Sequence, residues 1–207
     1  DLRESFPAPT VRNTPPDIAI REYWAFINGR PDIHTYLNEF GITIWEGNTT
    51  REFLDGRGLY DIPVRHGGKS YGFQYCNFNG EYDENYMPVG GVNQIEQTYY
   101  ELKNTCFRSR LVTSIWNPNQ EKEMALPPCW WNHQFVVTIE NGEKILNLHV
   151  TGRSCDVLFG TPFNIQQFSY YLAAMAKAQG MVAGELMATL VDAHIYGGLD
   201  DTEKPIE

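Results

Sequence analysis

The chain has 207 residues, of which 42% are hydrophobic, and this size suits one domain with a sizeable core. Its formal net charge of −10 argues against a nucleic-acid surface, which would need a basic face, but allows a nucleotide monomer bound by a local cluster of arginines. The chain contains no run of about 18 apolar residues and no secretory signal pattern, so we expect no membrane span and a cytoplasmic location.

The predicted elements of the first half are helices joined by irregular segments. In chain order they are a helix over 18–27 that Asp17 caps, a helix over 31–40, a short strand over 42–45, an irregular loop over 46–70 and an amphipathic helix over 92–103. Long irregular loops in compact domains are usually functional or mobile. We therefore expect the loop over 46–70 to lie near a binding site or to move.

The second half is predicted to be richer in strands. Its elements are strands over 111–116, 134–139 and 144–150, followed by a helix over 165–179 and a short helix over 183–188. The pair Asn141-Gly142 is a strong signal for a two-residue hairpin between the second and third of these strands. Such a hairpin brings Arg153 and Ser154 back towards Cys129. The mixture of helices and strands predicts an α/β domain with a mixed sheet flanked by helices.

The four cysteines give no sign of a metal site. They contain no C-x-x-C pair, and no histidine lies at metal-ligand spacing from them. In a cytoplasmic protein a cysteine is usually a small buried hydrophobe, and we expect this of Cys76, Cys106 and Cys155. Cys129 differs, because two prolines hold the chain stiff and extended just before its thiol. We therefore predict no metal and treat Cys129 as a candidate nucleophile.

The residues around Cys129 resemble the signature of a known enzyme family. Leu126-Pro127-Pro128 precedes Cys129, Gln134 follows it, and Arg153-Ser154-Cys155-Asp156-Val157, Gly160 and Pro162-Phe163-Asn164 come after the hairpin. In this order they resemble the thymidylate synthases and the related pyrimidine nucleotide hydroxymethylases. The runs 71–75 and 192–196 resemble two further elements of the family. The resemblance implies one domain over residues 1–207, with a three-layer fold in which helices flank a mixed sheet.

The resemblance also implies a catalytic set. Cys129 would add as a thiolate to C6 of a uracil ring, which activates C5 towards a one-carbon unit. Glu22 would organise water and proton transfer, and Tyr71 belongs to the same set. Asp156 would steady the folate, and Asn164 would read the base, since its amide both donates and accepts. Two plainer interpretations stay open: Glu22 as a solvated residue on an outer helix face, and Asn164 as the cap of a helix beginning at Ile165.

A binding set follows from the same resemblance. The nucleotide would be held by Arg153, Ser154, Gln134, His194 and Tyr196, with Arg110 reaching in from the partner subunit of a homodimer. The cosubstrate 5,10-methylenetetrahydrofolate would contact Trp45, Asp156, Gly160 and Phe163. A free thiol with a pKa of about 8.5 is mostly protonated at neutral pH, so a cation such as Arg153 would favour the thiolate. Ordinary packing of Trp45 in the core and an exposed structural Arg153 remain the alternatives.

Several positions depart from the family pattern. Trp130 stands where a histidine is usual, Gly152 where a glutamine is usual, Tyr75 where a tryptophan is usual, and Ser109 separates two arginines that are usually adjacent. We also expect the family's arginine-bearing N-terminal phosphate loop and its C-terminal closing segment to lie outside this chain. The expected function is methylation of dUMP to dTMP. The alternatives are 5-hydroxymethylation of dUMP or dCMP, and nucleotide binding without turnover.

Overall fold

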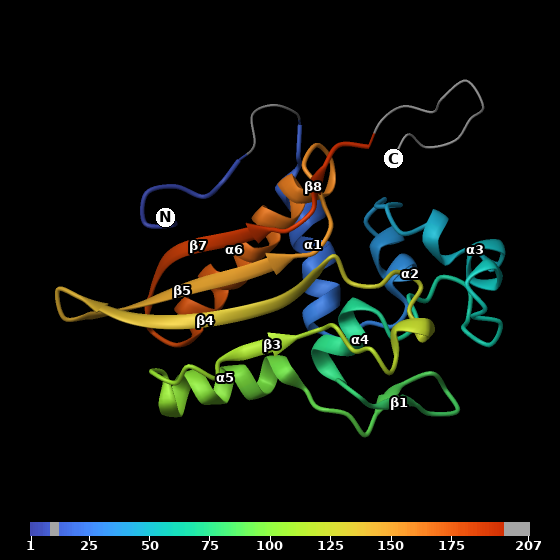
Figure 1. Ribbon diagram of the computed structural model, residues 1–207, viewed down its shortest axis with the longest axis horizontal. Coiled ribbons are helices and arrows are strands. Elements are labelled where there is room, and N and C mark those ends of the chain that lie inside the picture. The colour runs from blue at the N-terminus through green and yellow to red at the C-terminus, as the bar shows by residue number, and fades with distance from the viewer. Residues whose placement is uncertain (9–12, 197–207) are drawn as a thin grey trace.

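A four-stranded mixed sheet organises the fold (Figure 1). Its strand order is β3 (Val112–Ser114), β4 (Trp130–Glu140), β5 (Glu143–Gly152) and β7 (Val182–Leu190). The first three strands pair in antiparallel fashion, and β7 is parallel to β5. The computed structural model describes residues 1–8 and 13–196, so the remaining positions of the expected domain over 1–207 lie outside the described residues.

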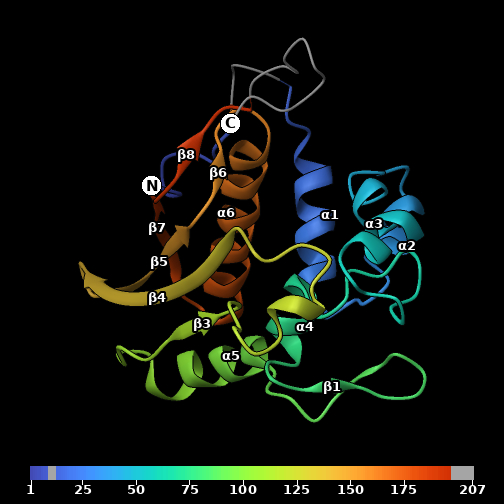
Figure 2. The ribbon, with the colours of Figure 1, turned by 45° about the vertical axis from the view of Figure 1, so that its right-hand side comes forward.

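Helices cover one face of this sheet. The six α-helices of the described part are α1 (Pro16–Ile27), α2 (Ile33–Asn38), α3 (Arg51–Gly56), α4 (Tyr71–Cys76), α5 (Gln94–Thr105) and α6 (Gly160–Ala178). Figure 2 shows α6 between the sheet and α1, and both contacts are extensive. Among the described residues no helix is long and apolar enough to cross a membrane. The expected mixed sheet packed against helices is therefore confirmed.

Short elements complete the architecture. Two small sheets pair β1 (Glu81–Tyr82) with β2 (Pro88–Val89), and β6 (Cys155–Asp156) with β8 (Ala193–His194). Two 3-10 turns, η1 (Gly47–Thr49) and η2 (Glu121–Glu123), lie in connecting segments. The parallel pair β6 and β8 brings the motif after the hairpin next to the run 192–196, because Asp156 is the register partner of His194.

The hairpin at Asn141-Gly142 is confirmed. Both residues have positive φ, 51° and 85°, and Glu140 pairs with Glu143 directly across the turn. Positive φ at both central positions matches the right-handed twist of the flanking strands. The hairpin returns the chain as predicted, since the backbone N–H of Arg153 donates to the carbonyl of Cys129 at 2.8 Å.

Two predicted elements have the wrong type. The predicted strand over 42–45 is a turn in which Glu46 N–H bonds back to the Thr43 carbonyl at 2.9 Å, and Ile42 and Trp45 are nevertheless buried. The predicted helix over 183–188 lies within β7. Ala, Glu, Leu and Met favour a helix locally, but the open edge of β5 supplies a ladder of hydrogen bonds that overrides so weak a preference.

Several boundaries also differ from the predictions. The loop over 46–70 contains η1 and α3, and the Thr50 hydroxyl caps α3 by accepting from the Phe53 N–H at 3.2 Å. Asp17 is not the cap of α1, because the helix already begins at Pro16, which needs no N–H there. Likewise α6 begins at Gly160, with Pro162 in its first turn, so Asn164 lies inside the helix and does not cap it.

The core lies where α1, α6 and the sheet meet. Tyr23, Phe168 and Tyr171 pack ring to ring there, with Phe135 of β4 against Tyr171. The buried Tyr75 hydroxyl lies 3.0 Å from His133 Nε2, and burial lowers the pKa of His133 to about 3. The tyrosine at position 75 therefore has a hydrogen-bonding partner in the core, as a buried hydroxyl needs. Of the cysteines expected to be buried, those at 106 and 155 are, and the one at 76 is half-buried.

Candidate active site

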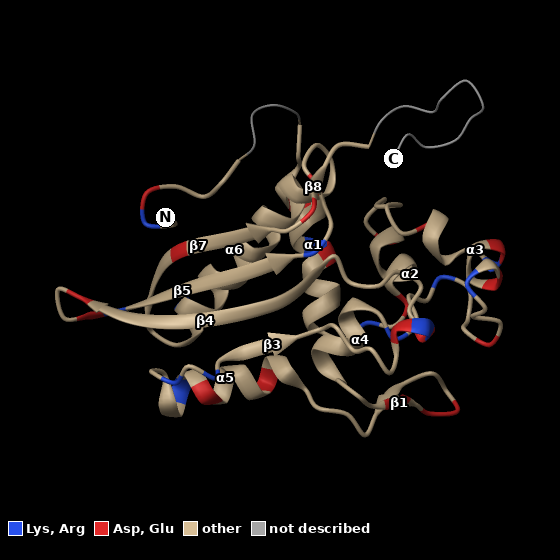
Figure 3. Ribbon diagram, in the orientation of Figure 1, with Lys and Arg blue, Asp and Glu red and all other residues tan. Residues whose placement is uncertain are grey.

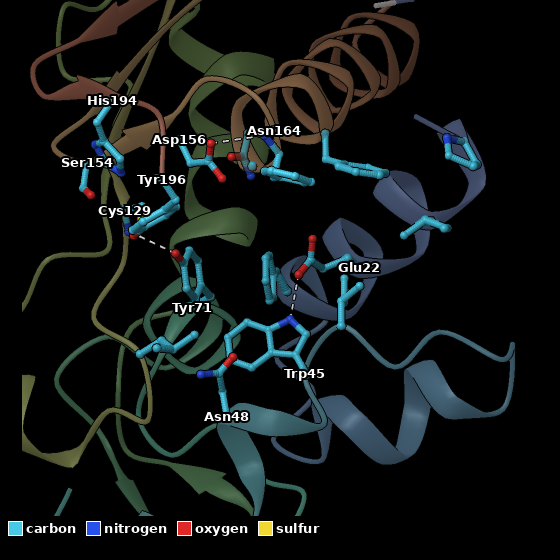
Figure 4. A pocket seen from close by; sticks show the side chains of 18 of the residues that line it. Glu22, Trp45, Asn48, Tyr71, Cys129, Ser154, Asp156, Asn164, His194 and Tyr196 are labelled. Atoms are coloured by element: carbon cyan, nitrogen blue, oxygen red, sulfur yellow. Dashed lines mark hydrogen bonds between the residues drawn. The ribbon is translucent and has the colours of Figure 1, made fainter. Parts of the chain in front are cut away.

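A pocket of about 740 Å³ opens between α1, the start of α6 and the segment before β4 (Figure 4). It is lined by eleven of the fourteen candidate residues: Glu22, Trp45, Tyr71, Cys129, Ser154, Asp156, Gly160, Phe163, Asn164, His194 and Tyr196. These residues come from segments far apart in the sequence, so the fold is what brings them together. A pocket of this size suits a small-molecule ligand.

Backbone hydrogen bonds hold Cys129 in the pocket wall. Its N–H donates to the Tyr71 hydroxyl at 2.9 Å, and its carbonyl accepts from the Arg153 N–H at 2.8 Å. Burial and the neighbouring Cys129 raise the pKa of Tyr71 well above its ordinary value. The phenol therefore stays protonated and keeps a hydrogen to donate beside the thiol.

The side chain of Arg153 braces the segment that leads to the thiol. Its Nε donates to the Pro128 carbonyl at 3.0 Å and its Nη2 to the Pro127 carbonyl at 3.2 Å. Its guanidinium also lies 5.0 Å from the centre of the Trp116 ring, a cation–π arrangement. Prolines have no N–H, but their carbonyls are free to accept, and Arg153 uses them. The cation thus lies against the Cys129 segment, outside the described pocket lining.

Two other candidates lie away from the pocket. Arg110 is exposed just before β3, at the edge of the sheet. Gln134 faces away from α6, because His133 and Phe135 on either side of it point into the core and strand side chains alternate. Its amide donates to the Ser109 carbonyl at 3.0 Å. Within the described chain, neither residue reaches the pocket.

Glu22 points into the pocket and not to the outer solvent (Figure 4). Trp45 Nε1 donates to one of its carboxylate oxygens and Gln167 Nε2 to the other, each at 2.6 Å. Burial raises the pKa of Glu22 and the two hydrogen bonds oppose this shift. A carboxyl with a raised pKa can exchange protons nearer to neutral pH, as a general acid or base requires.

The amide of Asn164 has partners on both of its polar atoms. Trp130 Nε1 donates to Asn164 Oδ1 at 2.8 Å, and Asn164 Nδ2 donates to Gln167 Oε1 at 3.0 Å. Gln167 was not among the site residues predicted from the sequence. Its spacing of three residues from Asn164 would have placed both on one helix face, had the helix been predicted to begin before Asn164.

The remaining pocket residues divide into a polar and an apolar part. Ser154, His194 and Tyr196 lie on the same side as Cys129 in Figure 4, and the His194 and Tyr196 rings are 5.0 Å apart. The apolar part of the lining includes Ile18, Phe26, Ile44, Trp45, Leu126 and Phe163. The apolar residues other than Trp45 and Phe163 escaped the sequence analysis, because isolated apolar positions look like ordinary core.

Asp156 adds a carboxylate to the pocket lining. Its Oδ1 accepts the N–H groups of Leu158 and Phe159 at 3.0 and 3.2 Å, a turn that leads the chain into α6. The pocket lining thus combines apolar surface with the two carboxylates of Glu22 and Asp156. No group of three or more His, Cys, Asp or Glu side chains in the described residues is arranged to hold a metal ion.

Comparison with known proteins is consistent with this geometry. A family model described as thymidylate synthase matches residues 1–204. The chain is 36% identical over 201 residues to thymidylate synthase of Saccharomyces cerevisiae, covering 93% of this chain and 66% of the yeast protein. It is 41% identical over 163 residues to the bifunctional dihydrofolate reductase-thymidylate synthase of Leishmania major, covering 77% of this chain and 31% of that protein.

A plant relative extends the same likeness over almost the whole chain. Bifunctional dihydrofolate reductase-thymidylate synthase 1 of Arabidopsis thaliana is 36% identical over 198 residues, covering 95% of this chain and 37% of that protein. The chain thus spans just under two thirds of the yeast relative's length and a smaller share of the bifunctional proteins. With a family model that matches nearly every residue, the chain belongs to the thymidylate synthase family.

Proposed function

We propose that the protein methylates dUMP to dTMP with 5,10-methylenetetrahydrofolate as cosubstrate. The observation that carries this proposal is that the Cys129 thiol, the Asn164 amide and the Glu22 carboxylate line one pocket. These groups supply a nucleophile, a reader of the base and a proton-transfer group. The yeast and plant relatives are named as thymidylate synthases, and their similarity to this chain supports the proposal.

Cys129 begins the reaction by attacking the uracil ring. Its thiolate forms a bond to C6, and the electrons of the C5–C6 double bond move towards C5 and O4. The Asn164 amide donates to O4 and accepts from N3–H, so it stabilises the charge that develops on the oxygen. Glu22, with its raised pKa, handles protons on the O4 side through ordered water. Tyr71 keeps a hydroxyl hydrogen beside Cys129 for the same stage.

The folate supplies the one-carbon unit and then a hydride when it is bound. Trp45 and Phe163 provide flat apolar surface for its ring, Gly160 leaves room beside them, and Asp156 offers a carboxylate to its N–H groups. Ser154, His194 and Tyr196 hold the sugar and phosphate of the nucleotide on the Cys129 side. Arg153 completes the nucleotide set as the resemblance implies, whereas Gln134 lies on the sheet face and does not reach the pocket of its own chain.

A homodimer built on the exposed sheet face is part of the proposal, as are the three-layer fold of the family and a cytoplasmic location. In the sheet register Val112, Gln134, His149 and Met187 form one row across β3, β4, β5 and β7 on the face away from α6. Val112 and Met187 are each 42% exposed, and few charges lie along these strands (Figure 3). A second copy covering this face would bring Arg110 to the neighbouring site.

Product analysis of the full-length protein tests this function. Incubation with dUMP and methylenetetrahydrofolate should give a nucleotide heavier by one CH2 unit, with dihydrofolate formed in equal amount and followed by absorbance. A hydroxymethyl nucleotide without dihydrofolate would instead establish the hydroxymethylase alternative. Binding of dUMP without turnover would establish a nucleotide-binding homologue, and either result overturns the methylation proposal.

A further inference from the structure

One chain of side-chain hydrogen bonds crosses the pocket wall from β4 to α1. Trp130 Nε1 donates to Asn164 Oδ1, Asn164 Nδ2 to Gln167 Oε1, and Gln167 Nε2 to Glu22, at 2.8, 3.0 and 2.6 Å. Trp45 Nε1 donates to the other Glu22 oxygen at 2.6 Å. Each link is direct, so four segments remote in sequence are joined without an intervening gap.

The two ends of this series of hydrogen bonds, Trp130 and Glu22, determine how the amides of Asn164 and Gln167 are oriented. An indole N–H donates and has no acceptor, so the amide atom of Asn164 that faces Trp130 must be oxygen. The Asn164 nitrogen then faces Gln167 and needs an oxygen there, which leaves the Gln167 nitrogen facing Glu22. A carboxylate accepts and does not donate, so it matches that nitrogen. A flip of Asn164 alone would set N–H against N–H at Trp130 and oxygen against oxygen at Gln167.

We propose that Trp130 and Gln167 set the base preference of the site, by locking the Asn164 amide in the orientation that fits uracil and opposes cytosine. The inference rests on the proposed function. Uracil presents an acceptor at O4 and a donor at N3, whereas cytosine presents a donor at N4 and an acceptor at N3. An Asn164 amide that can rotate by 180° can form hydrogen bonds with either base. An amide fixed in one orientation can do so with only one of them.

The lock uses half of the hydrogen-bonding capacity of the amide. An amide oxygen accepts two hydrogen bonds and its nitrogen donates two. Trp130 takes one lone pair and Gln167 accepts one hydrogen, which leaves one acceptor and one donor on a side chain that lines the pocket. One donor and one acceptor in fixed places are what the O4 and N3–H edge of uracil requires.

The packing around Trp130 makes the lock rigid. Trp130 is only 2% exposed, and its ring meets Phe168 at 5.2 Å between centroids. Gly152 pairs with Trp130 across β4 and β5, and a Cβ at position 152 would lie 2.4 Å from Cys155 Sγ and 3.1 Å from two atoms of the indole. Glycine at position 152 therefore leaves room for both the Cys155 thiol and the Trp130 ring. The two departures from the family pattern, at 130 and 152, are thus register partners in neighbouring strands.

Trp130→Phe is the direct test, because it keeps an aromatic ring and removes the N–H. Trp131→Phe is the matched control: it makes the same chemical change one residue along β4, at a side chain outside the described pocket lining. Isothermal titration of the full-length protein with dUMP and with dCMP measures the binding preference without any need for turnover. The ratio of kcat/KM values for the two nucleotides measures the same preference in the reaction.

We expect wild type and Trp131→Phe to share a strong preference for dUMP. In Trp130→Phe the ratio of dUMP to dCMP affinity should fall about tenfold or more, since a locked mismatch leaves buried polar groups unpaired. Gln167→Met removes the second contact of the Asn164 amide at nearly constant volume, and should lower the same ratio. This second variant also decides the question if Trp130→Phe does not fold, as circular dichroism and thermal melting will report.

Two negative results have different meanings. If wild type binds neither dUMP nor dCMP, the proposed function falls and this inference falls with it. If wild type prefers dUMP and folded Trp130→Phe and Gln167→Met keep the wild-type ratio, the proposed function stands and the lock is refuted. A purely structural role for Trp130 would change melting temperature and overall affinity but leave the ratio between the two bases unchanged.

Discussion

At the scale of single residues, two hydrogen bonds of its backbone hold Cys129 in place. The Tyr71 hydroxyl and the Arg153 N–H hold the peptide groups on either side of Cys129, and the Arg153 side chain holds the carbonyls of the two prolines before it. A change at the sulfur atom therefore leaves these contacts in place. This separation allows the chemistry of the thiol to be tested without disturbing the pocket.

Cys129→Ser should lower turnover of dUMP at least about a thousandfold, because a hydroxyl forms an anion far less readily than a thiol near neutral pH. Nucleotide affinity, measured by titration calorimetry, should stay close to that of wild type. Cys106→Ala, a change in the core far from the pocket lining, is the control and should keep its turnover. Turnover of Cys129→Ser within about tenfold of wild type would rule out covalent catalysis by this residue.

Gln167 also tunes the protonation of Glu22. Its hydrogen bond favours the carboxylate and so lowers a pKa that burial has raised, and Gln167→Met should raise the pKa of Glu22 further. If the carboxylate is the active form, activity disappears as pH falls through this pKa, so the acidic limb of the kcat/KM profile for dUMP should move to higher pH.

Gln179→Met is the matched control for this shift. Gln179 lies at the other end of α6 and donates to the Tyr99 carbonyl, so its loss should leave the limb where it is in wild type. An acidic limb that stays in place in Gln167→Met, or moves to lower pH, would show that Glu22 is not the group that titrates there.

At the scale of elements, the segment before α4 positions Tyr71 through close backbone contacts. The Lys69 N–H donates to the Glu123 carbonyl at 2.9 Å, and the Ala125 N–H donates to the Gly67 carbonyl at 3.1 Å. The Lys69 ammonium also pairs with Glu81 and Glu123. Gly68 lies between these contacts, at a φ of 63°, where a Cβ would come 2.4 Å from the Glu123 carbonyl oxygen.

Gly68→Ala should therefore lower the free energy of unfolding by at least about 2 kcal/mol, because the strain of a positive φ is joined by a clash with backbone. Gly58→Ala is the control: its φ is 77°, but a Cβ there would meet nothing within 4 Å, so only the conformational strain applies. Urea denaturation of both variants measures the difference. An equal decrease in the free energy of unfolding of the two variants would mean that the backbone before α4 shifts enough to accommodate the added methyl group.

At the scale of the whole molecule, the exposed sheet face bears on whether the pocket is complete within one chain. Arg110 lies beside β3, at the edge of that face, and not at the pocket of its own chain. The Arg153 guanidinium, the candidate cation of the same chain, is engaged with two proline carbonyls. An anion clamp formed with a second subunit would account for both observations.

Subunit mixing tests this arrangement. Arg110→Ala and Cys129→Ser should each be inactive alone and regain part of the wild-type activity after subunit exchange. The reason is that a mixed dimer holds one site with both defects and one site with neither. Cys129→Ser mixed with Glu22→Gln is the control, because both residues belong to the same chain's pocket and every site of the mixed dimer keeps a defect. Proven exchange without recovered activity would refute the cross-subunit role of Arg110.

The local signals of the sequence determined much of the fold and most of the pocket. The Asn141-Gly142 turn, the two long strands beside it and the amphipathic helices all depend on neighbouring residues, and these elements form as predicted. The ordered motif around Cys129, together with the matching runs elsewhere in the chain, likewise identified eleven of the lining residues. Such features need little information from distant parts of the chain, because a turn type or a helix face is specified within a few residues.

Only the tertiary structure decided the elements and contacts that depend on distant partners. The run over 183–188 has helix-favouring residues and becomes part of β7 because the edge of β5 is open to it. Trp45 lies in a turn and not in the predicted strand, and it donates a hydrogen bond to Glu22. Gln167 joins Asn164 of the same helix to Glu22 of α1. The physical reason is the same in each case: a hydrogen bond to a distant segment outweighs a local preference of a few tenths of a kcal/mol.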